Sequence, residues 1–255
     1  MSCGRSACKV GRMFGKRYRL FSLFGFDVSI DLSWLIIAAL IVWSLTSGFP
    51  QFYAGYPWYV YLTMGITGAL GFFLSIVFHE FSHSFVARAF DLKINGITLF
   101  IFGGLAEMEE RGPLSPRAEF WMALAGPLSS VVLGVTFLGL EAAGRAFAWP
   151  VPVIGVLGYL RLINFILAIF NLVPAFPLDG GRILRSILWG WKKDIRWATH
   201  IAAEFGNGFG WFLIFMGMFS MFRGQIVVGF WYFLIGMFMR SLAMMSYREI
   251  GYGHT

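Results

Sequence analysis

Long apolar runs, separated by short polar segments, dominate the chain and set its predicted architecture. A helix of about 20 apolar residues is long enough to cross the hydrocarbon core of a bilayer. The pattern predicts about six such helices, the first extended somewhat at both ends. They lie near residues 32–45, 61–90, 120–140, 157–173, 205–222 and 226–239. The predicted fold is therefore an all-α polytopic membrane protein.

One apolar segment between the second and third spans is too short to cross. Residues 92–112 read LKINGITLFIFGGLAEMEERG, and their apolar part, 94–105, is rich in β-branched and aromatic residues. This composition favours strands, with Gly103 and Gly104 at a turn or close approach. Unpaired strand edges are not tolerated in lipid. We therefore expect a small re-entrant β element, sheltered by protein or water, whose edge an extended polypeptide segment could join.

Composition and charge place the protein in the membrane. Hydrophobic residues make up 58% of the 255 residues and charged residues 13%, about half the share of a soluble domain. With the N-terminus inside, 17 of the 20 Lys and Arg fall on the cytoplasmic side. This bias predicts a multi-pass protein of the cell membrane with both termini cytoplasmic. Anionic lipid headgroups account for the net charge of +7, so we expect no nucleic-acid partner.

The chain divides into three predicted parts. A basic cytoplasmic arm, residues 1–20, holds Cys3 and Cys8, which we read as reduced thiols. A membrane domain covers residues 21–245, and a cytoplasmic tail covers 246–255. The first apolar run is too long for a signal-peptide core, so we interpret it as a retained span.

The second predicted span contains the sequence VFHEFSH, residues 77–83. His79 and His83 are four residues apart, so on a helix both imidazoles project from one face, as two ligands of one Zn²⁺ do. Glu80 falls beside the metal, where it can take a proton from water. The alternative is a set of buried polar residues satisfied by neighbouring helices, but ionisable residues are costly in a span. Arg88 marks the inner end of this helix, which places the metal roughly 10 Å below the cytoplasmic surface.

The third zinc ligand is left open by the residues themselves. The sequence SFVARAF after His83 offers no further histidine, while His200 and His254 look interfacial or terminal. Carboxylates are the remaining candidates. They are Glu107, Glu109, Glu110 and Asp179.

Asp179 lies in FNLVPAFPLDGGR, residues 170–182. With Arg161 at its outer end, the fourth span has only about 13 residues before Pro174 breaks it, so it ends at membrane depth. Asp179 then reaches the depth of the two histidines. The alternative is that Asp179 is the N-cap of a following helix.

Two motifs together carry a resemblance to a known family. H-E-x-x-H at residues 79–83 and N-x-x-P-x-x-x-x-D-G at residues 171–180 form a pair that resembles the double signature of the site-2 proteases, intramembrane zinc metalloproteases. The resemblance implies that His79, His83 and Asp179 bind one Zn²⁺ per chain. It implies that Glu80 is the catalytic base, and that Asn171 stabilises the oxyanion.

The resemblance also implies a class of substrate, and this sequence differs from other members of the family at several places. The implied function is hydrolysis of peptide bonds within transmembrane helices of membrane proteins. The flanking sequence looks most like the group with paired CBS domains after the sixth span, whereas this chain ends at SYREIGYGHT. Only a short segment, 141–156, stands where other members carry a PDZ domain. In GPLSS, Ser130 stands where some members have Asn.

Two other functions compete with this interpretation. A catalytically silent relative would bind helices without cutting them. A zinc transporter or sensor would need charged or histidine residues on several spans, and spans one, three, five and six offer almost none. The sequence leaves open whether a regulatory protein or a second copy is a partner.

Overall fold

A computed structural model of the protein describes residues 17–23, 26–31, 33–92, 94–100, 103–108 and 115–251. The chain forms two compact units, which we describe separately. The first comprises residues 1–112 and 129–165, and the second comprises 113–128 and 166–255. Several predicted features lie outside the described residues. These are most of the basic arm with Cys3 and Cys8, the loop residues Glu109 and Glu110, and the end of the tail with His254.

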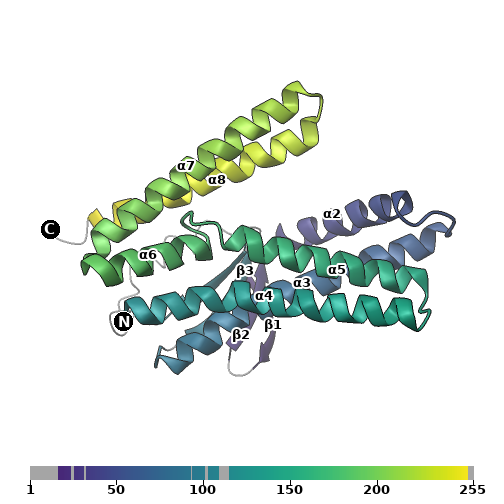
Figure 1. Ribbon diagram of the computed structural model, residues 1–255, viewed down its shortest axis with the longest axis horizontal. Helices are drawn as coiled ribbons and strands as arrows, with labels where there is room; N and C mark the ends of the chain where they lie inside the picture. Colours follow the sequence, from purple (N-terminus) through teal and green to yellow (C-terminus); the bar gives the residue numbers. More distant parts are fainter. Residues whose placement is uncertain are drawn as a thin grey trace. The chain divides into compact units, whose positions relative to one another are not determined.

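Helices account for most of the described chain (Figure 1). They are α2 (Ser33–Gly48), α3 (Trp58–Ala89), α4 (Pro116–Ala146), α5 (Val151–Asn171), α6 (Asp179–Lys192), α7 (Ile195–Phe222) and α8 (Ile226–Gly251). Five of them, α3, α4, α5, α7 and α8, are long and apolar enough to cross a membrane. The first predicted span corresponds to α2, which has 16 residues and is shorter than these five helices. The structure thus supports five of the six predicted spans.

A four-stranded sheet belongs to the first unit (Figure 1). Its strands are β1 (Arg17–Leu23), β2 (Phe26–Asp31), β3 (Ile94–Phe100) and β4 (Gly103–Met108), paired in that order. The β3–β4 pair is antiparallel and β2 runs parallel to β3, with Asp27 opposite Gly96. The sequence pattern did not predict β1 and β2, because it read residues 17–31 as the arm and the approach to the first span. Re-entry of β3 and β4 into a membrane remains a prediction.

Small residues on α3 hold the first unit together. A Cβ atom on Gly65 would lie 2.4 Å from Oγ1 of Thr46 on α2, and one on Gly71 would lie 2.7 Å from Cδ2 of Leu160 on α5. Helices in membranes associate largely through such close backbone approach, since lipid supplies no hydrophobic drive between them. The helix that carries the H-E-x-x-H motif is therefore packed tightly against two neighbours.

The second unit contains an antiparallel pair of helices, α7 and α8, joined by a turn at Gly224 with φ of 82° (Figure 1). Glycines meet across the pair. A Cβ atom on Gly210 would lie 2.8 Å from the carbonyl oxygen of Gly236, and one on Gly217 would lie 2.6 Å from that of Gly229. The two backbones are in contact along much of the pair.

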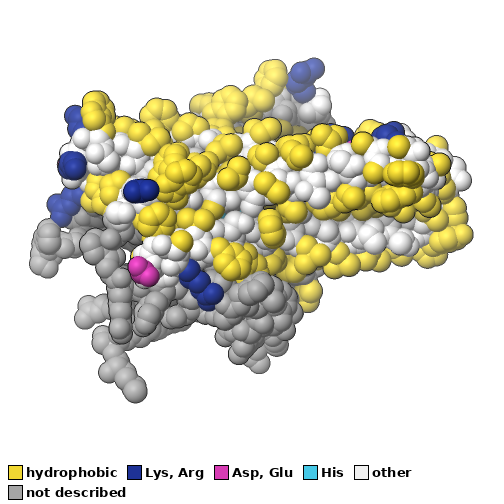
Figure 2. Space-filling model, turned by 60° about the horizontal axis from the view of Figure 1, so that its bottom comes forward, with side chains coloured by type: hydrophobic (Ala, Val, Ile, Leu, Met, Phe, Trp, Pro, Cys, Tyr) yellow, Lys and Arg dark blue, Asp and Glu magenta, His cyan; other side chains and the backbone are white. Residues whose placement is uncertain are grey.

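The described surface is largely apolar, as a lipid-facing surface must be. Figure 2 shows hydrophobic side chains spread across the described part of one face, with Lys and Arg at scattered positions. Individual aromatic residues are almost fully exposed, such as Phe222 at 90% and Phe147 at 76%. Such exposure is consistent with burial in a bilayer.

The fourth span differs from its prediction. We expected a helix at residues 157–173 with Arg161 at its outer end, but α5 begins at Val151, so Arg161 lies in the middle of the helix. Its Nε atom donates to Oε2 of Glu141 at 2.7 Å, and Nη2 of Arg145 donates to Oε1 of the same carboxylate at 2.8 Å. The paired charge allows the apolar helix to continue past Arg161.

Candidate metal centre

The two histidines of the motif occupy one face of α3. Their rings pack edge to face, with centroids 4.9 Å apart and planes at 79°. His79 is 4% exposed and His83 is 8% exposed, whereas Glu80 between them is only half-buried. The i, i+4 spacing therefore places both imidazoles on the same side, as the sequence predicted, with Glu80 one position round the helix.

The segment after α5 brings Asp179 to the start of a new helix. Helix α5 ends at Asn171, and Pro174 and Pro177 lie in the turn before α6. Leu178 is the N-cap of α6, and it makes no side-chain capping hydrogen bond. Asp179 is therefore the first helical residue, and the N-cap alternative is wrong. A carboxylate in the first turn is favoured by the positive end of the helix dipole.

The two glycines that follow Asp179 are required by close packing. A Cβ atom on Gly180 would lie 2.3 Å from the carbonyl oxygens of Leu172 and Val173, and one on Gly181 would lie 2.3 Å from the backbone nitrogen of Phe176. No real Cβ atom approaches backbone that closely. The D-G-G sequence thus lets α6 fold back directly onto the end of α5.

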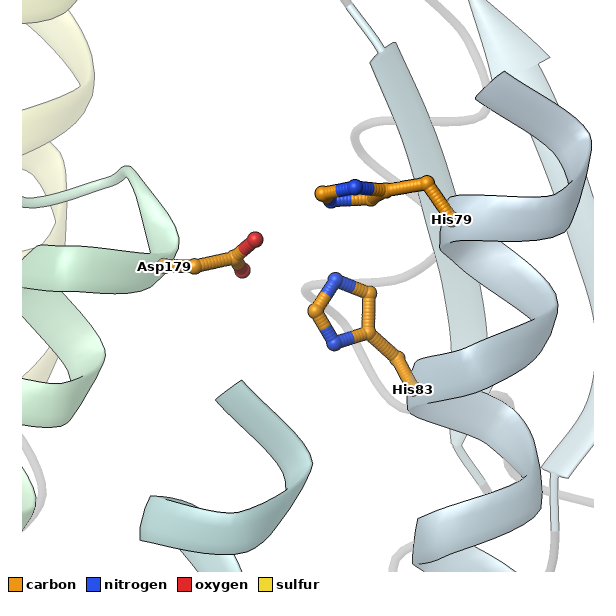
Figure 3. A group of neighbouring side chains, drawn as sticks. All are labelled: His79, His83 and Asp179. Atoms are coloured by element: carbon orange, nitrogen blue, oxygen red, sulfur yellow. The ribbon is translucent and has the colours of Figure 1, made fainter. Parts of the chain in front are cut away.

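His79, His83 and Asp179 are neighbours in the structure (Figure 3). One possible ligand atom from each residue lies within 4.8 Å of the others, and all three side chains are buried. Two ligands on one Zn²⁺ at about 2.0–2.2 Å each are at most about 4.4 Å apart, which is close to the spacing of these three ligand atoms. Two imidazoles and a carboxylate are also a usual donor set for catalytic zinc. The residues fit the metal.

The other predicted candidates are less favoured. Among the described residues, the grouping of three or more possible ligands is the His79, His83 and Asp179 set. Glu107 lies on β4, of which only the backbone is described, and His200 is half-buried on α7. Glu109 and Glu110 lie outside the described residues.

The side-chain amide of Asn171, the last residue of α5, donates one hydrogen bond within its own helix. Its Nδ2 atom donates to the carbonyl oxygen of Leu167 at 2.9 Å, one turn earlier in the same helix. An amide carries two N–H groups, so this bond uses one of them. The contact fixes the amide plane while leaving donor capacity.

Two polar contacts near the motifs were not predicted from the sequence. Nδ1 of His79 lies 2.8 Å from Oγ of Ser130 on α4. Nδ2 of Asn164 donates to Oγ of Ser75, which lies one turn before His79 on α3. The signal in the sequence was the presence of single polar residues inside apolar spans. The pairing itself requires knowledge of which helices touch.

Comparison with known proteins agrees with the geometry. The model of peptidase family M50 matches residues 67–146 and 142–217. A protein of Synechocystis sp. whose name classes it as a zinc metalloprotease is 39% identical over 242 residues, which cover 94% of this chain and 62% of that protein. The protein Rip3 of Mycobacterium tuberculosis, classed in the same way, is 36% identical over 86% of this chain and 56% of its own length. The chain thus spans about three fifths of the length of these relatives.

A solved structure is also similar. The site-2 protease from Methanocaldococcus jannaschii superposes with a TM-score of 0.57 at 29% sequence identity. The match covers 91% of this chain and 95% of that one. The similarity therefore extends over nearly the whole membrane region.

Proposed function

The chain belongs to peptidase family M50, and on that premise we propose that it is a zinc endopeptidase that hydrolyses peptide bonds within transmembrane helices of other proteins. The observation that carries the proposal is the buried group of His79, His83 and Asp179, in a chain with five apolar helices. Metallopeptidases use a set of metal ligands with a glutamate beside it as the base. Here the two histidines of that set lie well inside an apolar helix.

Zinc binding is assigned to three residues in this proposal. His79 and His83 supply imidazole nitrogens from α3, and Asp179 supplies a carboxylate oxygen from the start of α6. When bound, zinc polarises the scissile carbonyl and makes a nearby water acidic enough to lose its proton near neutral pH.

Glu80 and Asn171 handle the proton and the developing charge. Glu80 is adjacent to a ligand and half-buried, so its carboxylate can accept the proton of the attacking water and return it to the leaving amine. Asn171 keeps one amide N–H beyond its bond to Leu167, and that N–H can donate to the oxyanion of the tetrahedral intermediate.

A substrate helix must be opened before it can be cut. Its carbonyls are bonded within the helix, and exposed backbone groups cost several kcal/mol each in lipid. An extended substrate can re-pair them by adding to a sheet edge. Among the described strands β3 lies between β2 and β4, so within the predicted re-entrant element the edge that a substrate could join is that of β4.

The proposed setting is the cell membrane with both termini cytoplasmic. The distribution of Lys and Arg supports this orientation, with 17 of 20 on the inner side. His83 lies six residues before the inner end of α3 at Ala89, or about 9 Å along the helix. We therefore place the cut on the cytoplasmic side of the substrate midplane, and we include lipid but no nucleic acid among the partners.

The test is cleavage by purified protein in lipid vesicles that also contain a membrane protein with a single span. Wild-type protein should release two fragments whose new ends, mapped by mass spectrometry, lie within the span. Glu80→Gln should keep one zinc per chain and release no fragments. Cleavage in an extramembrane loop would refute intramembrane proteolysis, and a wild-type protein that binds zinc and helices without cutting any would favour the silent relative.

A further inference from the structure

One ring nitrogen of His79, Nδ1, lies beside a hydroxyl on α4, so we take Nε2, on the other side of the ring, as the nitrogen that binds the metal. Nδ1 of His79 lies 2.8 Å from Oγ of Ser130, which is a normal hydrogen-bond distance. Both residues are buried, with Ser130 at 0% and His79 at 4% exposure. The contact joins α3 to α4 across 51 residues of sequence.

Only one polarity of this hydrogen bond is compatible with metal binding. If Nδ1 carries the proton and donates it to Ser130, Nε2 keeps its lone pair and can bind a metal. If Ser130 donates to Nδ1 instead, the neutral ring carries its proton on Nε2 and cannot use that atom as a ligand. The hydroxyl can accept and donate, so metal binding at Nε2 selects the first arrangement.

The position of Ser130 is fixed by the packing of α4 on α5. A Cβ atom on Gly134, one turn after Ser130, would lie 2.9 Å from Cε1 of Phe165, so the two helices are in close contact there. Further along, Glu141 accepts the 2.7 Å hydrogen bond from Arg161. Helix α4 thus holds the Ser130 hydroxyl at a defined place beside α3.

We propose that Ser130 is a positioning residue that sets the tautomer and ring orientation of His79, so that Nε2 is presented to zinc. The inference rests on the proposed metal site and adds a residue that the ligand motifs do not contain. Partners of this kind orient ligating histidines in other metal sites, and their loss typically weakens metal binding about 10- to 100-fold.

The experiment measures zinc affinity by competition with a chelator for wild-type protein, Ser130→Ala and Ser130→Thr. The control is Ser186→Ala, which removes another buried helical hydroxyl; among the described residues its hydrogen bond stays within its own helix, to the carbonyl oxygen of Ile183 at 2.7 Å. We expect Ser130→Ala to bind zinc about 10- to 100-fold more weakly, and Ser130→Thr and Ser186→Ala to stay near wild type.

A second readout keeps the test independent of folding effects. The chain has four histidines, so ¹⁵N-histidine NMR of metal-free protein can resolve the tautomer of each ring. Wild-type His79 should be protonated on Nδ1, and Ser130→Ala should shift the ring toward the other tautomer. Unchanged zinc affinity together with an unchanged tautomer in Ser130→Ala would overturn the inference while leaving the proposed function intact. A wild-type protein that binds no zinc would overturn both.

Discussion

Nε of Arg185 donates a hydrogen bond of 2.7 Å to Oε1 of Glu119, a carboxylate that is fully buried. Nη2 of Arg185 contacts the same oxygen, and the guanidinium lies 5.1 Å from the ring centroid of Phe176. Glu119 is in the first turn of α4, and Arg185 lies six residues after Asp179 on α6. The pair therefore ties the helix that begins with Asp179 to the start of α4.

Replacing Arg185 by Met should destabilise the protein strongly. The change leaves the charge of Glu119 buried without a partner, which typically costs about 3–5 kcal/mol. The double variant Glu119→Leu with Arg185→Met should recover most of the loss, because an apolar pair can replace a buried ion pair. Thermal unfolding in detergent measures both. A double variant as unstable as the sum of its two single changes would show that the ion pair does not account for the effect.

Asp179→Ala should lower zinc occupancy sharply if Asp179 is the third ligand. The loop variants Glu107→Ala, Glu109→Ala and Glu110→Ala should each keep one zinc per chain, since the structure groups Asp179 with the two histidines. Metal analysis of purified protein distinguishes the four. The opposite pattern would move the third ligand into the loop between α3 and α4.

The predictions that depend on local backbone geometry agree with the structure. The H-E-x-x-H spacing dictated that His79 and His83 share a face of α3, and the structure confirms this placement. The proline-rich segment predicted a break before Asp179, and α5 ends at Asn171. Both follow from backbone rules that apply within a few residues.

Features that depend on contacts between distant segments were missed. Ser130 was seen only as a residue that replaces Asn, because nothing in the sequence tells that α4 approaches α3 at that point. The sequence predicts Arg161 at the outer end of the fourth span. Its partner Glu141, 20 residues away, offsets the cost of placing a charge in lipid, and the helix begins at Val151 instead.

Two glycine-to-alanine changes on α7 should alter the stability of the protein in opposite directions. Gly217→Ala places a Cβ atom 2.6 Å from the carbonyl oxygen of Gly229, so the helices must separate, at a typical cost of about 1–3 kcal/mol. Gly208→Ala on the same helix meets no atom within 4 Å and should stabilise α7 by up to about 1 kcal/mol through helix propensity. Unfolding midpoints that move in the same direction for both variants would contradict the packing argument.

Variants of Asn171 should distinguish a loss of catalysis from a loss of structure, because turnover and zinc content are measured separately. Asn171→Ala removes the proposed oxyanion donor, and loss of one such donor typically lowers turnover about 100-fold or more. The ligands are unchanged, so zinc content should stay at one per chain, and KM for a model substrate should change little, because the donor acts mainly in the transition state. The variant also loses the 2.9 Å bond to Leu167, which Asn171→Gln could restore only with an altered amide position. We therefore expect low turnover in both variants with normal zinc content. Low turnover accompanied by a parallel loss of zinc would instead assign Asn171 to holding the end of α5 in place.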